Sequence, residues 1–196
     1  MTGAAVPGSL DERVDAAFEA TPRAAFLPEA VRSQWEEDRP LPIVAGMTNS
    51  QPSTVRDMLR RLDVPVGARV LDVGSGSGWT TALLAHLVGP GGWVLGVELE
   101  PELVAFGADN LRATQRDWAR IEPASDAVLG RPERAPYDRI LVSAMARDLP
   151  RELVDQLATG GVLVVPVDGR MVWARRRPDG SVQVERFGRY RFVPLR

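Results

Sequence analysis

Apolar residues along this chain follow two different periods. From Arg69 onward, short apolar runs typical of strands alternate with stripes at the 3.6-residue period of helices. The runs predict strands over 69–73, 93–97, 118–123, 137–143, 161–167, 171–177 and 182–192. The stripes predict helices over 77–88, 101–112 and 151–158. This alternation predicts an α/β fold with a doubly wound, mainly parallel sheet, helices on both faces and an antiparallel C-terminal hairpin.

The first 65 residues follow a helical pattern broken by a long irregular stretch. A helix is predicted over 10–20, behind the cap residue Ser9, and another begins at Pro52. Residues 23–51 are rich in proline, with a short helix around 29–36, and a loop of this length is often functional. Residues 1–8 are interpreted as a loose tail. We expect one domain over 1–196, in which 1–65 supply the N-terminal helices and this loop and 66–196 supply the α/β core.

Composition narrows the classes of function. The 196 residues include no cysteine and one histidine, His86, which excludes disulfides, zinc–thiolate sites and a thiol nucleophile, so no metal is expected. The net charge is −2, and no apolar run is long enough to span a membrane, so neither nucleic acid nor a membrane is an expected partner. Arg175, Arg176 and Arg177 precede a Pro-Asp-Gly turn and are interpreted as a solvated strand end. Because no secretory signal is readable, a cytoplasmic location is expected.

The most informative motif is a glycine-rich turn that follows the first predicted strand. Gly74, Gly76 and Gly78 stand at alternate positions, with Ser75 between the first two. Glycine lets a bulky ligand lie directly against the main chain. The G-x-G-x-G spacing differs from the G-x-G-x-x-G of dinucleotide sites, and Asp72 suits a cofactor that carries an ammonium group. The motif therefore favours S-adenosylmethionine, and the alternative is a tight turn without a ligand.

Two acidic residues extend this candidate site along the expected sheet edge. Glu98 ends the second predicted strand 20 residues after Gly78, where a carboxylate accepts hydrogen bonds from ribose hydroxyls. Asp126 follows the third predicted strand, where it could accept from an adenine amino group or, as the alternative, cap a turn. Because ligands of doubly wound sheets bind beyond the carboxyl ends of the strands, we expect these residues to meet in a Rossmann-like fold.

Several segments in order resemble the protein-L-isoaspartate O-methyltransferase family, and the resemblance covers nearly all of the chain. The glycine turn and Glu98 are shared with many methyltransferases, whereas the other segments are closer to this family's own patterns. These are Thr21-Pro22-Arg23-Ala24-Ala25-Phe26-Leu27-Pro28-Glu29, Asp38-Arg39-Pro40-Leu41-Pro42-Ile43, Thr48-Asn49-Ser50-Gln51-Pro52, Ala135-Pro136-Tyr137-Asp138-Arg139-Ile140-Leu141-Val142-Ser143 and Arg191-Phe192-Val193-Pro194-Leu195.

The resemblance implies that a methyl group passes from S-adenosylmethionine to the α-carboxylate of an L-isoaspartyl residue in a damaged protein or peptide, leaving S-adenosylhomocysteine. The ester then closes to a succinimide that reopens partly to normal aspartate. A carboxyl group of this kind ordinarily has a pKa of about 3.9 and is already ionised at neutral pH, so the attack needs no general base. The protein is expected to act as a monomer.

The resemblance also implies roles for individual positions. Ser50 is the loop serine that the family places at the reacting carboxylate, and its alternative role is a helix cap ahead of Pro52. The neighbouring substrate loop comprises Met47, Thr48, Asn49 and Gln51. The cofactor-binding set comprises Asp72, Gly74, Ser75, Gly76, Gly78, Glu98, Leu99, Asp126 and Ala127. In this set Asp72, Gly74 and Gly76 would line the methionine part, Glu98 the ribose and Asp126 the adenine.

The chain departs from the family pattern at two places. The family's Gly-Gln-Thr-Ile-Ser is replaced by residues 46–50, which carry Met47 and Asn49, and its Gly-Asp-Gly is replaced by Ser125-Asp126-Ala127. The first change motivates an alternative function, methylation of aspartate or isoaspartate in a dedicated peptide or protein, as in natural-product maturation. A nicotinamide oxidoreductase and a non-catalytic nucleoside-binding module are alternatives from other classes.

Overall fold

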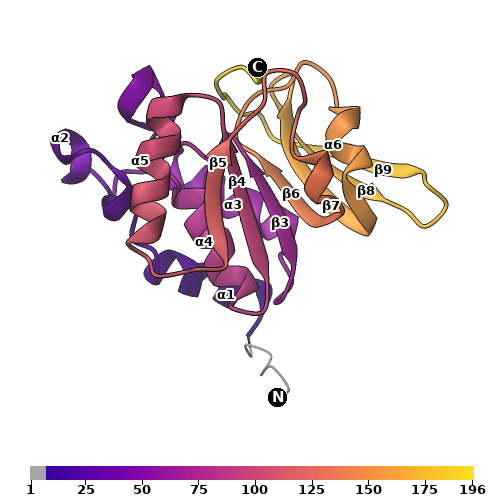
Figure 1. Ribbon diagram of the computed structural model, residues 1–196, viewed down its shortest axis with the longest axis horizontal. Coiled ribbons are helices and arrows are strands. Elements are labelled where there is room, and N and C mark those ends of the chain that lie inside the picture. The colour runs from indigo at the N-terminus through magenta and orange to yellow at the C-terminus, as the bar shows by residue number, and fades with distance from the viewer. Residues whose placement is uncertain (1–7) are drawn as a thin grey trace.

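The computed structural model describes residues 8–196 and contains one seven-stranded sheet (Figure 1). Its order is β5 (Ala119–Pro123), β4 (Trp93–Glu98), β3 (Arg69–Val73), β6 (Tyr137–Val142), β7 (Leu157–Val167), β8 (Arg170–Arg176) and β9 (Val182–Phe187). The first five are parallel, and β8 and β9 add an antiparallel edge. The expected doubly wound topology is confirmed, with its switch point between β3 and β6. Of the expected tail over 1–8, residues 1–7 lie outside the described part.

The two faces of the sheet are covered unequally. One face packs against α3 (Pro52–Leu62), α4 (Trp79–Val88) and α5 (Pro101–Arg112), and α1 (Leu10–Glu19) packs on α3 and α4. The other face carries the short α6 (Arg151–Asp155) and the 124–136 segment, which contains η3 (Pro132–Arg134). Figure 1 shows α6 beside β7 and β8, on the side away from α5. No helix within residues 8–196 is long and apolar enough to cross a membrane.

Local signals explain where the helices begin. Ser9 and Glu12 form a reciprocal capping box at α1, which satisfies two free N–H groups at its start. α5 begins at Pro101, as predicted, because proline tolerates the first helical position. α4 begins at Trp79 rather than at residue 77, because Gly78 has a φ of 85° and stands outside the helix as its N-cap.

Other predicted boundaries were also wrong, including the start of the strand predicted over 161–167, which begins at Leu157. The helix predicted over 151–158 ends at Asp155, because the chain from Leu157 already pairs with Tyr137 in the sheet. The last strand ends at Phe187 instead of 192, since Gly188 takes a φ of 46° and turns the chain. The short helix around 29–36 is only four residues long, α2 (Glu29–Arg32), and is followed by turns.

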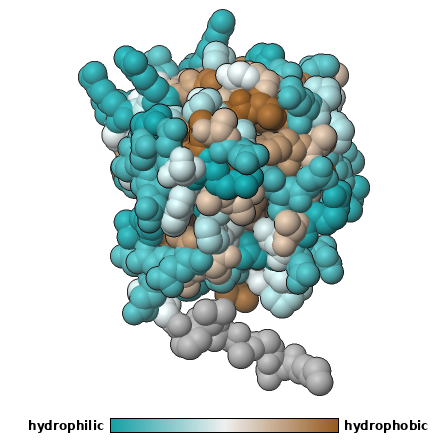
Figure 2. Space-filling view, turned by 90° about the vertical axis from the view of Figure 1, so that its left-hand side faces the viewer, coloured by the Kyte–Doolittle hydropathy of each residue, from teal (hydrophilic) through white to brown (hydrophobic). Residues whose placement is uncertain are grey.

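The long segment 23–51 is ordered and docks against the body of the molecule. It contains η1 (Arg23–Phe26), α2, η2 (Val44–Gly46) and a ribbon of β1 (Leu41–Pro42) paired with β2 (Thr48–Asn49). Leu27, Leu41 and Ile43 form a small core with Leu103 of α5. Figure 2 shows this side of the molecule as mostly hydrophilic, with hydrophobic residues gathered near the top, the end at which Figure 1 places the C-terminus.

Candidate active site

A cavity of about 290 Å³ opens beyond the carboxyl ends of β3, β4 and β6, at the switch point of the sheet. Its size is near the lower end of the range for small-molecule sites. Its walls come from six stretches of the chain, which lie within 43–50, 73–80, 97–103, 124–130, 143–144 and 193–196. Segments far apart in sequence thus converge on one concave site, as the sequence predicted for the residues after each strand.

The glycines of the turn after β3 have two different roles. Gly74 and Gly76 have φ values of 76° and 53° and line the cavity. A Cβ at Gly76 would meet only a methyl group of Ile43, at 3.8 Å, so bare backbone faces the space. Gly78 does not line the cavity: a Cβ there would lie 2.7 Å from the carbonyl oxygen of Gly107. The third glycine therefore allows α4 and α5 to approach each other.

Glu98 lies on the cavity wall at the end of β4, and its residue is only 8% exposed. Its Oε2 accepts a hydrogen bond from the Gly76 N–H at 2.8 Å, and its Oε1 accepts from Leu99 and Glu100 at 2.7 and 3.2 Å. Three backbone donors therefore fix the carboxylate and join it to the glycine turn. Leu99 is also part of the wall. A fixed carboxylate beside bare backbone fits the hydroxyls of a nucleoside.

Two buried polar atoms beside the turn have no partner within the described residues: Oδ1 of Asp72 and Oγ of Ser75. Ser75 lines the cavity, but its hydroxyl oxygen is itself buried, so the residue reaches the space through its other atoms. Asp72 is fully buried behind the turn, off the cavity wall, and its Oδ2 accepts from the Thr81 hydroxyl at 2.7 Å. Burial raises the pKa of Asp72 to about 6, opposed by hydrogen bonds from Thr81 and Thr80 and assisted by the charge of Glu98.

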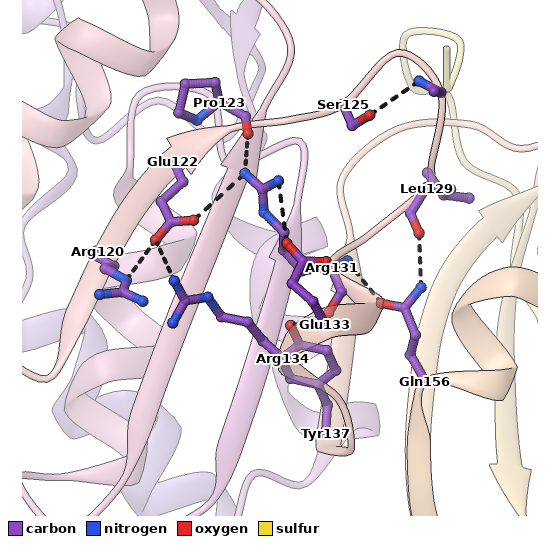
Figure 3. A network of polar contacts seen from close by, with 11 residues as sticks. Arg120, Glu122, Pro123, Ser125, Leu129, Arg131, Glu133, Arg134, Tyr137 and Gln156 are labelled. Carbon is purple, nitrogen blue, oxygen red and sulfur yellow. Dashed lines mark hydrogen bonds and ion pairs between the residues drawn. The ribbon is translucent and has the colours of Figure 1, made fainter.

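The loop after β5 is held at both ends and bows outward between them (Figure 3). At its far end, Gln156 accepts from the Arg131 N–H and donates to the Leu129 carbonyl, both at 2.8 Å. At its near end, the Arg131 guanidinium contacts the carbonyl of Pro123 and the carboxylate of Glu122. The cavity is lined here by Ala124, Ser125, Val128, Leu129 and Gly130. Asp126 and Ala127, at the exposed crest, are not part of the wall.

The predicted substrate loop forms the opposite wall. Met47, Thr48, Asn49 and Ser50 line the cavity, whereas Gln51 lines a second, adjoining one of about 490 Å³. Ser50 lines both cavities, and its hydroxyl makes no hydrogen bond to any residue of 8–196. The structure does not show Ser50 as a helix cap: Gln51 is the N-cap of α3 and makes no capping bond through its side chain.

Asp38 performs the capping function from a distance. Its Oδ1 accepts from the Ser53 N–H at 2.8 Å, and its Oδ2 accepts from Nε2 of Gln51 at 3.0 Å. These hydrogen bonds lower the pKa of Asp38. The cap thus ties the long loop to the start of α3 and leaves the neighbouring serine hydroxyl free.

Arg23 is a residue of this site that the sequence analysis missed. It is 2% exposed, and its guanidinium donates to the carbonyls of Glu37, Arg39, Asn49 and Ser50 at 2.9–3.1 Å. Its Nε also donates to Oδ1 of Asn49 at 2.6 Å. Burial lowers the pKa of Arg23 to about 10. The only sequence signal was its place in the family-like segment after the first helix, and hydropathy argues against a buried arginine.

Asn49 connects this arginine to the glycine turn. Its Nδ2 donates to the Ser77 hydroxyl at 2.8 Å, and the residue is 5% exposed. The amide that replaces the family's aliphatic residue is therefore used inside the protein, as a bridge between Arg23 and Ser77. The substrate loop and the glycine turn are joined by buried polar contacts.

His86 and two tryptophans near the site make mainly structural contacts. His86 is half-buried on α4, and burial lowers its pKa. Trp79 packs edge-on against Phe18 at 5.4 Å and donates to the Thr21 carbonyl at 3.0 Å, while it also lines the cavity. Trp35 is partly exposed and does not line the cavity. Within residues 8–196 no cluster of metal-ligating side chains is found.

The last residues of the chain complete the cavity wall. Backbone hydrogen bonds join Met145 to Val193 and to Leu195, at 2.7 and 2.8 Å. Arg196 then forms an ion pair with Glu100 at the start of α5. The segment 193–196 therefore crosses from the end of β6 toward β4 beside the cavity.

The parallel sheet with a glycine turn and a fixed carboxylate at its switch point defines a methyltransferase of the Rossmann-like class, a fold shared by its structural neighbours. Residues 7–196 match the family model described as protein-L-isoaspartate(D-aspartate) O-methyltransferase. The chain belongs to this family.

Individual relatives agree with the family match. The chain is 43% identical over 187 residues to a protein-L-isoaspartate O-methyltransferase of Aeropyrum pernix, covering 93% of this chain and 72% of the relative. It is 44% identical over 192 residues to that of Thermococcus onnurineus, covering 94% and 85%. A Plasmodium falciparum structure assigned to the same activity, in complex with S-adenosyl-L-homocysteine, superposes with a TM-score of 0.82 at 27% identity, covering 94% and 90%.

Proposed function

We propose that this protein is a carboxyl methyltransferase that uses S-adenosylmethionine to methylate the α-carboxylate of L-isoaspartyl residues in damaged proteins or peptides. The observation that carries the proposal is the family match over residues 7–196, joined to a free serine hydroxyl where the two cavities meet. We further propose a single domain over 1–196 that acts as a monomer in the cytoplasm without a metal. The composition, without cysteine and with one histidine, supports the last point.

The cavity suits this cofactor in two respects. Gly74 and Gly76 expose bare backbone, and three backbone N–H groups orient the Glu98 carboxylate for ribose hydroxyls. When bound, S-adenosylmethionine supplies a methyl group on a positively charged sulfur. Asp126, at the exposed crest of its loop, would need a movement of residues 125–128 to serve the adenine.

The protein has little chemistry of its own to perform. The reacting carboxylate is already ionised, so the chain has to orient it, remove its water and leave its charge nucleophilic. The Ser50 hydroxyl donates to one carboxylate oxygen and thereby directs the other. Arg23 donates to the Ser50 carbonyl from the buried side, which fixes the serine without placing a cation on the reacting oxygen.

The function is tested by incubating the protein with labelled S-adenosylmethionine and three matched peptides that contain isoaspartate, aspartate or asparagine at one position. Label only in the isoaspartyl peptide, released as methanol at alkaline pH, is the expected result. The alternative of a dedicated substrate rested on Met47 and Asn49, and Asn49 is now accounted for by its internal contacts. Bound cofactor with no label in any peptide would contradict the repair function and favour that alternative.

Replacement Ser50→Ala is expected to lower kcat by about 10–100-fold, because an unaligned carboxylate loses much of the advantage of orientation. Affinity for S-adenosylhomocysteine should stay unchanged, since the backbone of the loop is held by Arg23. Steady-state kinetics with the isoaspartyl peptide measures the effect. Ser33→Ala, an exposed serine of the same segment, is the control. A kcat equal to that of the unmodified protein would remove Ser50 from the reaction.

Replacement Glu98→Gln is expected to weaken binding of S-adenosylhomocysteine by about 5–30-fold. The amide loses the negative charge, and one acceptor oxygen becomes a donor that faces backbone N–H groups. Isothermal titration calorimetry gives the affinity, with Glu102→Gln on the exposed surface of α5 as the control. Equal affinities for the Glu98 variant and the unmodified protein would argue against the ribose role.

A further inference from the structure

The second cavity, of about 490 Å³, extends from Ser50 away from the glycine turn. Its walls come from Pro40, from positions within 48–54, from Ser143 and from 189–193. Thr48, Ser50, Ser143 and Val193 line both cavities, so the two are contiguous at the candidate reaction centre. If the reacting carboxylate lies at Ser50, as the proposed function requires, the rest of the substrate chain leaves through this second space.

The charged residues that line the second cavity are positive. Among the described residues that line it, Arg189 and Arg191 are the only charged ones, and no aspartate or glutamate is included. Two carboxylates that contact lining residues have other partners: Asp57 accepts from Arg61 at 3.0 Å and from the Tyr190 hydroxyl, and Asp38 caps α3. The charged side chains on this wall, within residues 8–196, are therefore both positive.

The two arginines are exposed, and within residues 8–196 neither guanidinium forms a hydrogen bond or an ion pair. Three other arginines of the same region do have partners, whereas Arg175 and Arg186 have none within residues 8–196: Arg170 donates to the Gly188 carbonyl, Arg177 donates to Gln183 and Arg196 pairs with Glu100. The backbone between the two is anchored, because the Tyr190 N–H donates to the Gly169 carbonyl at 2.9 Å and the Tyr190 hydroxyl donates to Asp57. Two free cations are thus presented from a fixed point of the wall.

We propose that Arg189 and Arg191 form a subsite for acidic side chains of the substrate, on residues that flank the isoaspartyl residue. Neither arginine lines the first cavity, so they attract the substrate without neutralising the carboxylate that must react. Exposed ion pairs are weak and are screened by salt. The subsite therefore acts on KM more than on kcat, and it selects among isoaspartyl sequences.

The test compares three isoaspartyl peptides that differ only in their neighbours, which are glutamate, glutamine or lysine on either side. At low ionic strength the glutamate peptide is expected to have a KM about 3–10-fold below that of the glutamine peptide on the side that reaches the subsite. The lysine peptide should have a KM above both, and 0.5 M NaCl should remove most of the difference.

Variants identify the residues responsible. The double variant Arg189→Gln/Arg191→Gln should lose the preference for glutamate while keeping its kcat on the glutamine peptide. The double variant Arg189→Glu/Arg191→Glu should prefer the lysine peptide to the glutamate peptide. Arg186→Gln, an exposed arginine of β9 that does not line the cavity, is the matched control. An unchanged glutamate preference in both double variants, or no preference in the unmodified protein, would overturn the proposal.

This inference rests on the proposed function, and one measurement separates the two. Failure to methylate any of the three peptides would contradict the repair function. The subsite would still be tested by fluorescence anisotropy of the same labelled peptides with S-adenosylhomocysteine present. Tighter binding of the glutamate peptide that disappears in the glutamine double variant supports the subsite, and equal binding of all three peptides rejects it.

Discussion

The variant Arg23→Met is expected to lower the free energy of unfolding by about 3–5 kcal/mol. Methionine keeps much of the volume of the side chain but donates no hydrogen bonds. Four carbonyls and the Asn49 Oδ1 atom would lose their donor at a site that is 2% exposed, and water reaches such a site poorly. Because these acceptors lie on the loop that contains Ser50, methyl transfer should fall together with stability.

Urea unfolding followed by circular dichroism measures this loss. Arg186→Met, at an exposed position of β9, controls for the removal of one positive charge and should change stability by less than about 0.5 kcal/mol. Asn49→Leu should cost less than the arginine variant, because it leaves the carbonyl contacts of Arg23 in place. A loss below about 1 kcal/mol for Arg23→Met would show that the buried contacts do not hold the loop.

The second prediction with a large effect is an increase in the free energy of unfolding. Asp72→Asn is expected to stabilise the ligand-free protein at pH 7.5 by about 3 kcal/mol, at 1.36 kcal/mol per unit of pKa difference. The pKa of Asp72 is raised from 3.8 to about 6 in the folded protein, mainly by burial. The favourable contribution of the protonated acid is fully present below pH 4 and is lost as the pH rises through about 6. Above that pH the fold contains a buried charge that the amide would remove.

Urea unfolding between pH 4 and pH 8 tests whether ionisation of Asp72 destabilises the fold. The free energy of unfolding of the unmodified protein should carry a component that falls between pH 4 and pH 6, and the Asp72→Asn variant should lack it. Asp148→Asn, an exposed position, should leave the profile as it is. A variant less stable than the unmodified protein at pH 7.5 would mean that the ionised carboxylate has a favourable partner. The same variant also tests whether Asp72 contributes to cofactor binding.

Elements that are bounded by proline or glycine were predictable from the sequence. β3 begins at Arg69 and ends at Val73 as predicted, because a glycine turn ends it, and α5 runs from Pro101 to Arg112 as predicted. The residues after β3 and β4 could be brought to one edge by the rule for parallel sheets alone. The prediction failed where pairing between strands determines the structure. Leu157 follows a helix in sequence and was predicted to continue it, but it pairs with Tyr137 in the sheet.

The chemistry of the site was only partly predictable, because several side chains depend on segments that meet only in the fold. Gly78 belongs to the same motif as Gly76, yet the reason for a glycine there is the close approach of the α5 backbone at Gly107. Arg23 and Asn49 find their partners 14–28 residues away, on three separate stretches. The place of Asp126 depends on how Gln156 and Arg131 anchor its loop. The cofactor and substrate roles of these residues remain predictions until the variants are measured.

The path of residues 193–196 along the cavity wall has a practical consequence for anyone who produces this protein. An affinity tag fused after Arg196 would emerge beside Glu100, at the mouth through which ligands must pass. α1 lies at the other end of the molecule (Figure 1). Dyes and surface attachments are therefore better placed on α1, at the end of the molecule away from this opening.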